Sequence, residues 1–275
     1  MRIGVIDSGV GGLSILNVVR AQVPAHYFYC MDNQYLPYGT KSELFIRQRL
    51  VQLTQYLVTQ HQVELVLIAC NTATTQAVDH LRQQFDLPFV GVVPAIKPAA
   101  HYCGARPFAV LATQATVNGP YIEQLVAEFA PANDVELIGS SELVLLAEQK
   151  VWYRADVAAQ VHRVLAATSL SVSKTTAVVL GCTHFPFLAD EIRSWLGSEV
   201  ELFDTADAIA RRVMQLKLQF AFNDEQEKSA DVFISTAELD AIQQRRLSEL
   251  GFGQHLCWPN PAETEKDYSS LSSLS

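Results

Sequence analysis

The chain has 275 residues, of which 49% are hydrophobic and 18% are charged, and its formal net charge is −9. These values are ordinary for a soluble globular enzyme, and the length allows one large domain or two small ones. The acidic balance and the lack of a basic block argue against a protein that binds nucleic acid through its phosphates.

Apolar strands and helical stretches alternate along the chain. Residues 46–57 and 121–129 carry apolar side chains at helical spacing, so we expect helices there. The expected strands are apolar runs bounded by small or polar residues, and they cover residues 1–8, 63–69, 88–93, 105–113, 176–181 and 232–236. This alternation predicts parallel βαβ units, with crossings between two lobes near residues 94–98 and 203–205.

The two halves of the sequence resemble each other. In each half an early apolar strand ends at a hydroxyl, which is Ser8 or Thr113, and a later strand ends at a thiol, which is Cys70 or Cys182. The order is the same and the intervals are similar, which favours an internal duplication. Because ligands bind at the carboxyl ends of parallel strands, the two thiols could approach one ligand from opposite faces.

The remaining features of the sequence indicate a cytoplasmic protein with reduced thiols. The chain opens directly into a strand, so we expect no signal peptide, and no apolar run reaches the roughly 18–20 residues of a membrane span. The five cysteines are odd in number and widely spaced, without a C-x-x-C pair, so we expect neither a disulfide scaffold nor a metal site.

The glycine-rich turn after the first strand allows two interpretations. Residues 7–14 would expose backbone N–H groups to a ligand. Gly9 and Gly11, with Asp32 further on, also resemble part of a dinucleotide-binding fingerprint. However, Ser14 stands where that fingerprint requires glycine or alanine, and the charge of Asp7 would repel a pyrophosphate.

Cys70 and Cys182 are the strongest candidates for chemistry. Each ends a strand where a helix should begin, and a helix N-terminus lowers the pKa of a thiol and favours the reactive thiolate. The alternative is that they pack as small apolar residues, as we expect for the other cysteines. His184 could relay a proton for Cys182, and Asp7 could do so for Cys70 or could cap a helix. By default, Glu148 would be a solvated residue on a helix.

Six short stretches resemble the glutamate racemases, within the cofactor-independent aspartate/glutamate racemase superfamily. They occur in the family's order, and the resemblance extends from Met1 to about Phe252. The stretches cover residues 6–14, 36–42, 69–74, 91–99, 111–116 and 180–186.

The resemblance implies an α/β fold of two similar parallel-sheet lobes with the active site between them. Residues 1–95 and 207–258 would form the first lobe, residues 96–206 the second, and residues 259–275 a disordered tail. It also implies interconversion of L- and D-glutamate without a cofactor, which supplies D-glutamate for peptidoglycan. A homodimer is possible. The alternatives are a racemase of another acidic amino acid, such as aspartate, and a non-catalytic carboxylate-binding protein.

The resemblance also implies roles for particular residues. Cys70 would take the α-proton from D-glutamate with help from Asp7, and Cys182 would take it from L-glutamate with help from His184. Glu148 would support His184. The substrate-binding set that it implies is Asp7, Ser8, Tyr38, Gly39, Asn71, Thr72, Thr113, Thr116, Thr183 and His184.

Overall fold

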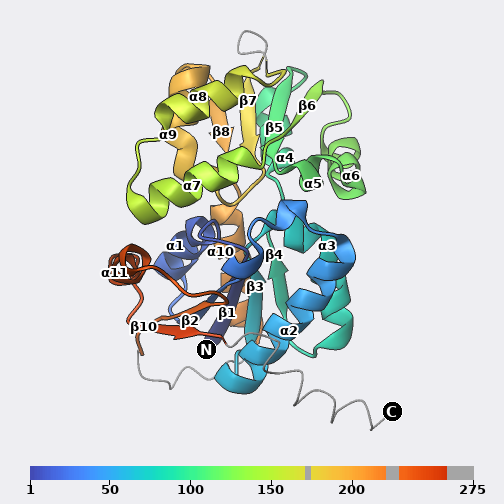
Figure 1. The fold of residues 1–275 in the computed structure, drawn as a ribbon. Helices are drawn as coiled ribbons and strands as arrows, with labels where there is room; N and C mark the ends of the chain where they lie inside the picture. Colours follow the sequence, from blue (N-terminus) through green and yellow to red (C-terminus); the bar gives the residue numbers. More distant parts are fainter. Residues whose placement is uncertain (171–174, 221–228, 259–275) are drawn as a thin grey trace.

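The computed structural model describes residues 1–170, 175–220 and 229–258, and these residues form two parallel β-sheets covered by helices. Figure 1 shows the two sheets in separate lobes, one above the other. No helix in the described part of the chain has both the length and the apolar character needed to cross a membrane.

The larger sheet has six strands among the described residues, in the order β10-β9-β2-β1-β3-β4, and every pairing is parallel. Its central strands are apolar and buried on both faces, which is typical of a parallel sheet covered on both sides. The strands are β1 (Arg2–Asp7), β2 (His26–Met31), β3 (Leu65–Ile68), β4 (Phe89–Gly91), β9 (Val232–Ser235) and β10 (Gln254–Cys257).

Helices cover both faces of this sheet. The helices are α1 (Leu13–Gln22), α2 (Glu43–His61), α3 (Asn71–Gln84), α10 (Ala206–Gln219) and α11 (Ala241–Glu249). The core on one face includes apolar residues of α1 and α10, and the core on the other face includes apolar residues of α2 and α3. The helix predicted at 46–57 is confirmed, and it is longer because Ser42 caps its first turn and Gln62, with φ 51°, ends it.

The smaller sheet has four strands among the described residues, in the order β6-β5-β7-β8, again all parallel. Its strands are β5 (Phe108–Ala112), β6 (Val135–Gly139), β7 (Ala177–Leu180) and β8 (Glu201–Phe203). Its helices are α4 (Ile96–Cys103), α5 (Gln114–Val117), α6 (Pro120–Phe129), α7 (Glu142–Tyr153), α8 (Ala158–Ala166) and α9 (Ala189–Leu196). The predicted helix at 121–129 therefore corresponds to α6.

The two sheets share one strand order. The run β2-β1-β3-β4 in the larger sheet has the same topology as β6-β5-β7-β8 in the smaller one. The predicted class of two similar parallel α/β lobes is thus confirmed, and β9 and β10 extend the first sheet beside β2. The division at residues 95/96 and 206/207 stays a prediction, and the predicted tail at 259–275 lies outside the described residues.

The shared topology places four predicted residues at equivalent strand ends. Ser8 follows β1 and Cys70 follows the neighbouring strand β3, whereas Thr113 follows β5 and Cys182 follows β7. Since β1 and β5 are interior strands of their sheets, these strand ends lie near the middle of the carboxyl edge of each sheet.

Candidate active site

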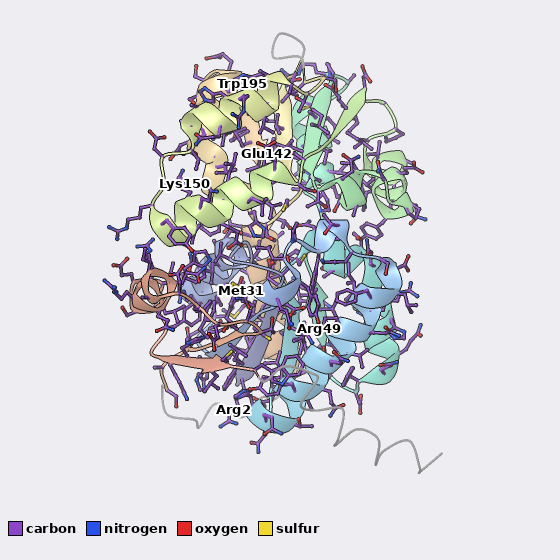
Figure 2. All side chains as sticks on the ribbon, viewed as in Figure 1. Arg2, Met31, Arg49, Glu142, Lys150 and Trp195 are labelled. Carbon is purple, nitrogen blue, oxygen red and sulfur yellow. The ribbon has the colours of Figure 1, made fainter. Side chains whose placement is uncertain are left out.

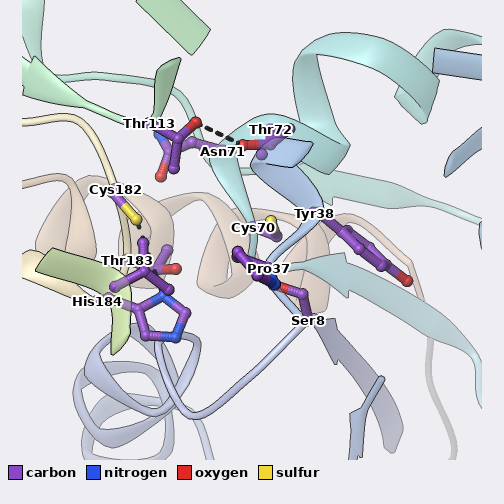
Figure 3. A pocket seen from close by; sticks show the side chains of 12 residues that line it. Ser8, Pro37, Tyr38, Cys70, Asn71, Thr72, Thr113, Cys182, Thr183 and His184 are labelled. Carbon is purple, nitrogen blue, oxygen red and sulfur yellow. Dashed lines mark hydrogen bonds between the residues drawn. The ribbon is translucent and has the colours of Figure 1, made fainter. Parts of the chain in front are cut away.

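A pocket lies between the two lobes, at the carboxyl ends of the central strands. The space between its walls, including the part open to solvent, amounts to about 260 Å³. Figure 3 shows its side chains, with both thiols facing this space from different lobes. The lining residues are Ser8, Pro37, Tyr38, Gly39, Cys70, Asn71, Thr72, Thr113, Val144, Cys182, Thr183 and His184.

Cys70 is the thiol contributed by the first lobe, at the N-cap of α3 and two residues after the end of β3. Burial raises the pKa of the Cys70 thiol well above its ordinary value, and the charge of Asp7 raises it further. The backbone N–H of Ala73 and the hydroxyl of Ser8 lower this pKa, but by less. The helix N-terminus thus lowers the pKa of Cys70 as predicted, but the predicted net decrease is wrong, because desolvation outweighs the nearby donors. Cys70 rests as a thiol, which can donate a proton.

Cys182 is the thiol of the second lobe, and His184 lies on the same turn. The Cys182 Sγ is 3.8 Å from the Nδ1 of His184, and the opposite ring nitrogen, Nε2, is 2.7 Å from Oε1 of Glu148. Burial by itself lowers the pKa of His184, but its hydrogen bonds to Cys182 and Glu148 outweigh burial and raise the pKa well above the ordinary value. The raised pKa favours the imidazolium form of His184, which can donate to both partners. A helix begins after this turn, as expected: the 3-10 helix η3 (Phe185–Leu188) leads directly into α9.

Glu148 connects His184 to the glycine-rich turn of the first lobe. Besides contacting His184, its carboxylate accepts the backbone N–H of Val10 at 2.7 Å and the indole N–H of Trp152 at 2.9 Å. A Cβ at Gly9 would overlap the Glu148 carboxylate, and a Cβ at Gly11 would overlap the His184 ring. The default interpretation of Glu148 as a solvated residue is therefore wrong. The turn needs glycine because a side chain of the second lobe packs directly against its backbone.

Asp7 lies behind the pocket, at the end of β1, and is fully buried. Its carboxylate accepts the backbone N–H of Gly9 at 2.9 Å and the hydroxyl of Thr183 at 3.0 Å. Burial raises the pKa of Asp7 from 3.8 to about 6, although the charge of His184 and these two hydrogen bonds lower it. Asp7 therefore changes its charge close to neutral pH, next to Cys70.

Hydroxyl and amide groups line the pocket on the side of α3 and α5. The Thr72 and Thr113 hydroxyls are 3.0 Å apart, and those of Thr113 and Thr116 are also 3.0 Å apart, so the cluster joins both lobes. The buried Asn71 side chain also lies here, and its Nδ2 has no hydrogen-bond partner among the described residues. A buried amide without a partner is costly, so a bound acceptor such as a carboxylate would satisfy it.

Hydrogen bonds across the lobes close the back of the pocket. The Ser14 hydroxyl donates to the Thr183 carbonyl at 2.8 Å, and the Thr183 hydroxyl donates to Asp7. Together with the bond from Val10 to Glu148, these contacts fix the two strand ends relative to each other. The site therefore exists only when both lobes are in contact.

Most of the predicted substrate-binding residues line this one pocket. Asp7 and Thr116 do not line the pocket, but each is hydrogen-bonded to a lining residue, Asp7 to Thr183 and Thr116 to Thr113. Sequence reasoning missed two lining residues. Pro37 belongs to a stretch that resembled the family, so a signal was present, whereas Val144 lies on the apolar face of α7 and gave none.

The dinucleotide interpretation of the glycine-rich turn is wrong. Asp32, the acid that would meet the ribose, is fully buried and forms a two-bond ion pair with Arg49 at 2.8 and 2.9 Å. The space beside the glycines is occupied by Glu148 and His184. In the part of the chain that the structure describes, no group of three or more His, Cys, Asp or Glu side chains is arranged to hold a metal ion.

Comparisons with known proteins identify the family of this chain. Residues 3–213 match the Asp/Glu/hydantoin racemase family. A glutamate racemase from Shewanella loihica is 43% identical over 249 residues, which cover 90% of this chain and 92% of the relative. The crystal structure of Escherichia coli glutamate racemase with L-glutamate and the activator UDP-MurNAc-Ala has a TM-score of 0.85 at 38% identity, covering 93% of this chain and 97% of that one. The chain therefore belongs to the glutamate racemases of the Asp/Glu/hydantoin racemase family.

Proposed function

We propose that this protein interconverts L- and D-glutamate by moving the α-proton between two thiols. The observation that carries this proposal is that Cys70 and Cys182 line one pocket from opposite lobes. Inversion of a carbon needs a base on one face and an acid on the other, because one fixed group would return the proton to the face it left. D-glutamate formed in this way would supply peptidoglycan synthesis.

The polar groups of the pocket would hold the two carboxylates of glutamate. The Asn71 amide, which has no partner among the described residues, and the hydroxyls of Ser8, Thr72 and Thr113 are suitable donors. Charge builds up next to the α-carboxylate when the α-proton leaves, so these donors would stabilise the transition state more than the bound substrate. The complex of the E. coli relative with L-glutamate supports this choice of substrate.

The two halves of the reaction would use different proton partners. On the L-glutamate side, the His184 imidazolium stabilises a thiolate at Cys182, which then removes the α-proton. On the other face, the Cys70 thiol donates its proton to the carbon and becomes a thiolate. D-glutamate reacts in the reverse direction, with Cys70 as the base and Asp7 as its neighbouring acid/base group. The raised pKa of Asp7, about 6, suits a group that exchanges protons near neutral pH.

A racemisation assay tests this proposal. The purified protein, without added cofactor, is incubated with L-glutamate, D-glutamate, L-aspartate or D-aspartate, and optical rotation is followed to equilibrium. We expect both glutamate enantiomers to reach the same racemic end point and aspartate to react far more slowly. Because UDP-MurNAc-Ala activates the E. coli relative, a parallel series includes it. Faster conversion of aspartate would favour an aspartate racemase, and glutamate binding without conversion in either series would favour a carboxylate-binding protein. The expected homodimer stays a prediction that sedimentation analysis would test.

A further inference from the structure

A buried ion pair lies in the first lobe, outside the pocket. Arg49 of α2 donates two parallel hydrogen bonds to Asp32, from Nε at 2.9 Å and from Nη2 at 2.8 Å. Figure 2 labels Arg49 within the first lobe. The Asp32 side chain is 0% exposed and the Arg49 side chain 3%. A buried pair of this kind usually adds little net stability, because desolvation offsets the attraction, so its value should lie in the geometry that it imposes.

The Asp32 carboxylate also holds the turn that forms one wall of the pocket. It accepts the Tyr38 hydroxyl at 2.6 Å and the Thr236 hydroxyl at 2.7 Å, so both carboxylate oxygens are fully engaged. Tyr38 begins the 3-10 helix η2 (Tyr38–Thr40). Burial, followed by the charge of Asp32, raises the pKa of Tyr38 well above its ordinary value, so the phenol stays a donor.

Among the described residues, the hydrogen bond from Tyr38 to Asp32 is the long-range hydrogen bond of the turn. Within the described residues, the other hydrogen bonds of residues 37–41 are local, from Thr40 to Pro37 and from Lys41 to Tyr38. The turn also lies tightly against the second lobe, since a Cβ at Gly39 would come within 3.0 Å of the Thr113 side chain. Tyr38 and Gly39 both line the pocket. The position of Asp32 therefore sets the position of this wall.

Arg49 in turn is held by aromatic rings. Its guanidinium carbon lies 4.9 Å from the centre of the Tyr35 ring and 4.7 Å from that of Trp258, which follows β10. The planar guanidinium suits both the two-bond pairing and the stacking, which an ammonium group cannot reproduce. The network thus extends from the pocket wall to Trp258.

We propose that Asp32 and Arg49 are positioning residues that fix the Tyr38–Gly39 turn for glutamate binding. The proposal rests on the function proposed above. Neither residue lines the pocket. They therefore affect the affinity for glutamate, through Tyr38, and do not affect the reactivity of the thiols. Loss of the network should therefore raise KM for both enantiomers about tenfold and change kcat by less than about threefold.

A double-mutant cycle tests this inference. The variants are Tyr38→Phe, which removes only the phenolic hydroxyl, Asp32→Asn, and the two combined. Arg47→Ala is the matched control, because Arg47 lies on the same helix in an exposed ion pair with Glu43. If Asp32 acts through Tyr38, each single variant raises KM and the double variant raises it no further than the larger single effect. Arg49→Lys should also raise KM, and it keeps the test available if Asp32→Asn fails to fold.

The possible outcomes separate the two proposals. A wild-type protein that is inactive both with and without UDP-MurNAc-Ala would refute the proposed function and this inference with it. If the wild type is active, either of two results would overturn the positioning role alone. One is an unchanged KM in Tyr38→Phe, and the other is effects on KM that multiply in the double variant. Equal loss of kcat in all variants without a change in KM would also overturn it.

Discussion

Replacing Asp7 by Asn should change how the stability of the protein depends on pH. Burial raises the pKa of Asp7 from 3.8 to about 6, although the charge of His184 lowers it. Between these two pH values the folded protein binds a proton that the unfolded chain has lost. The stability that Asp7 contributes is therefore fully present below pH 3.8 and is lost as the pH rises through about 6.

The size of this effect follows from the shift. Moving the pKa from 3.8 to about 6 corresponds to about 3 kcal/mol at pH values above both. From about pH 4.5 to about pH 7, ionisation of Asp7 should cost the wild type about 2 kcal/mol of folding free energy. Asp7→Asn has nearly the same shape and cannot ionise, so it should escape this loss.

Urea unfolding at several pH values between about 4.5 and 7 measures the difference. The free energy of unfolding of Asp7→Asn, relative to wild type, should rise by about 2 kcal/mol across this range. Asp86→Asn, which removes an exposed carboxylate elsewhere in the first lobe, controls for the loss of one negative charge. A difference between Asp7→Asn and wild type that does not change with pH would refute the assigned environment of Asp7.

Three further changes test other parts of the account. Cys182→Ser should lower kcat at least about 100-fold, because a serine hydroxyl is a far weaker base. Cys103→Ser is the control and should keep most of the activity. Comparable losses of kcat in the two variants would mean that Cys70 and Cys182 are not the reacting pair. The pKa of His184 is raised by its hydrogen bond to Cys182 and by Glu148, and Glu148→Gln removes the second of these contributions, so it should lower kcat/KM about 10-fold or more. Because enantiomers have equal free energies, that loss must be the same in both directions, as initial rates will show. Leu67→Ala, in the fully buried centre of β3, should lower the unfolding free energy by about 2–5 kcal/mol in urea titrations.

Sequence reasoning was most successful for the ends of the central strands. Ser8, Cys70, Thr113 and Cys182 each follow an apolar run, and the topology of parallel sheets brings such ends to one edge. Both expected helices were confirmed as well, since their apolar spacing is regular. The local sequence pattern was sufficient in these places because the apolar residues of a single helix face or a single strand carry nearly all of the information that predicts the element.

Four strands were not located from the sequence. β6 and β8 lie at the edges of the smaller sheet and β10 at the edge of the larger one, and all three are partly exposed. Edge strands face solvent and carry polar residues, so their apolar signal is weak. β2 is buried, but its aromatic run after His26 was not singled out.

The interactions across long sequence distances could not be predicted. The contact between Glu148 and the Val10 backbone joins residues 138 positions apart, and no local pattern marks it. The pKa of Cys70 depends on burial, which follows from the packing of two lobes and not from its place before a helix. For the same reason, the ion pair of Asp32 and Arg49 was not foreseen, and Asp32 suggested a ribose contact in its place.

Deuterium incorporation tests the central claim, that two thiols act on opposite faces of one carbon. L-Glutamate is converted in D₂O, and the α-position of each enantiomer is analysed after chiral separation during the first part of the reaction. If Cys182 removes the proton and Cys70 delivers a solvent-derived one, early D-glutamate carries α-deuterium while the remaining L-glutamate still carries α-protium. Early D-glutamate that retains the original α-proton would show that a single group moves it, and this result would contradict the two-thiol account.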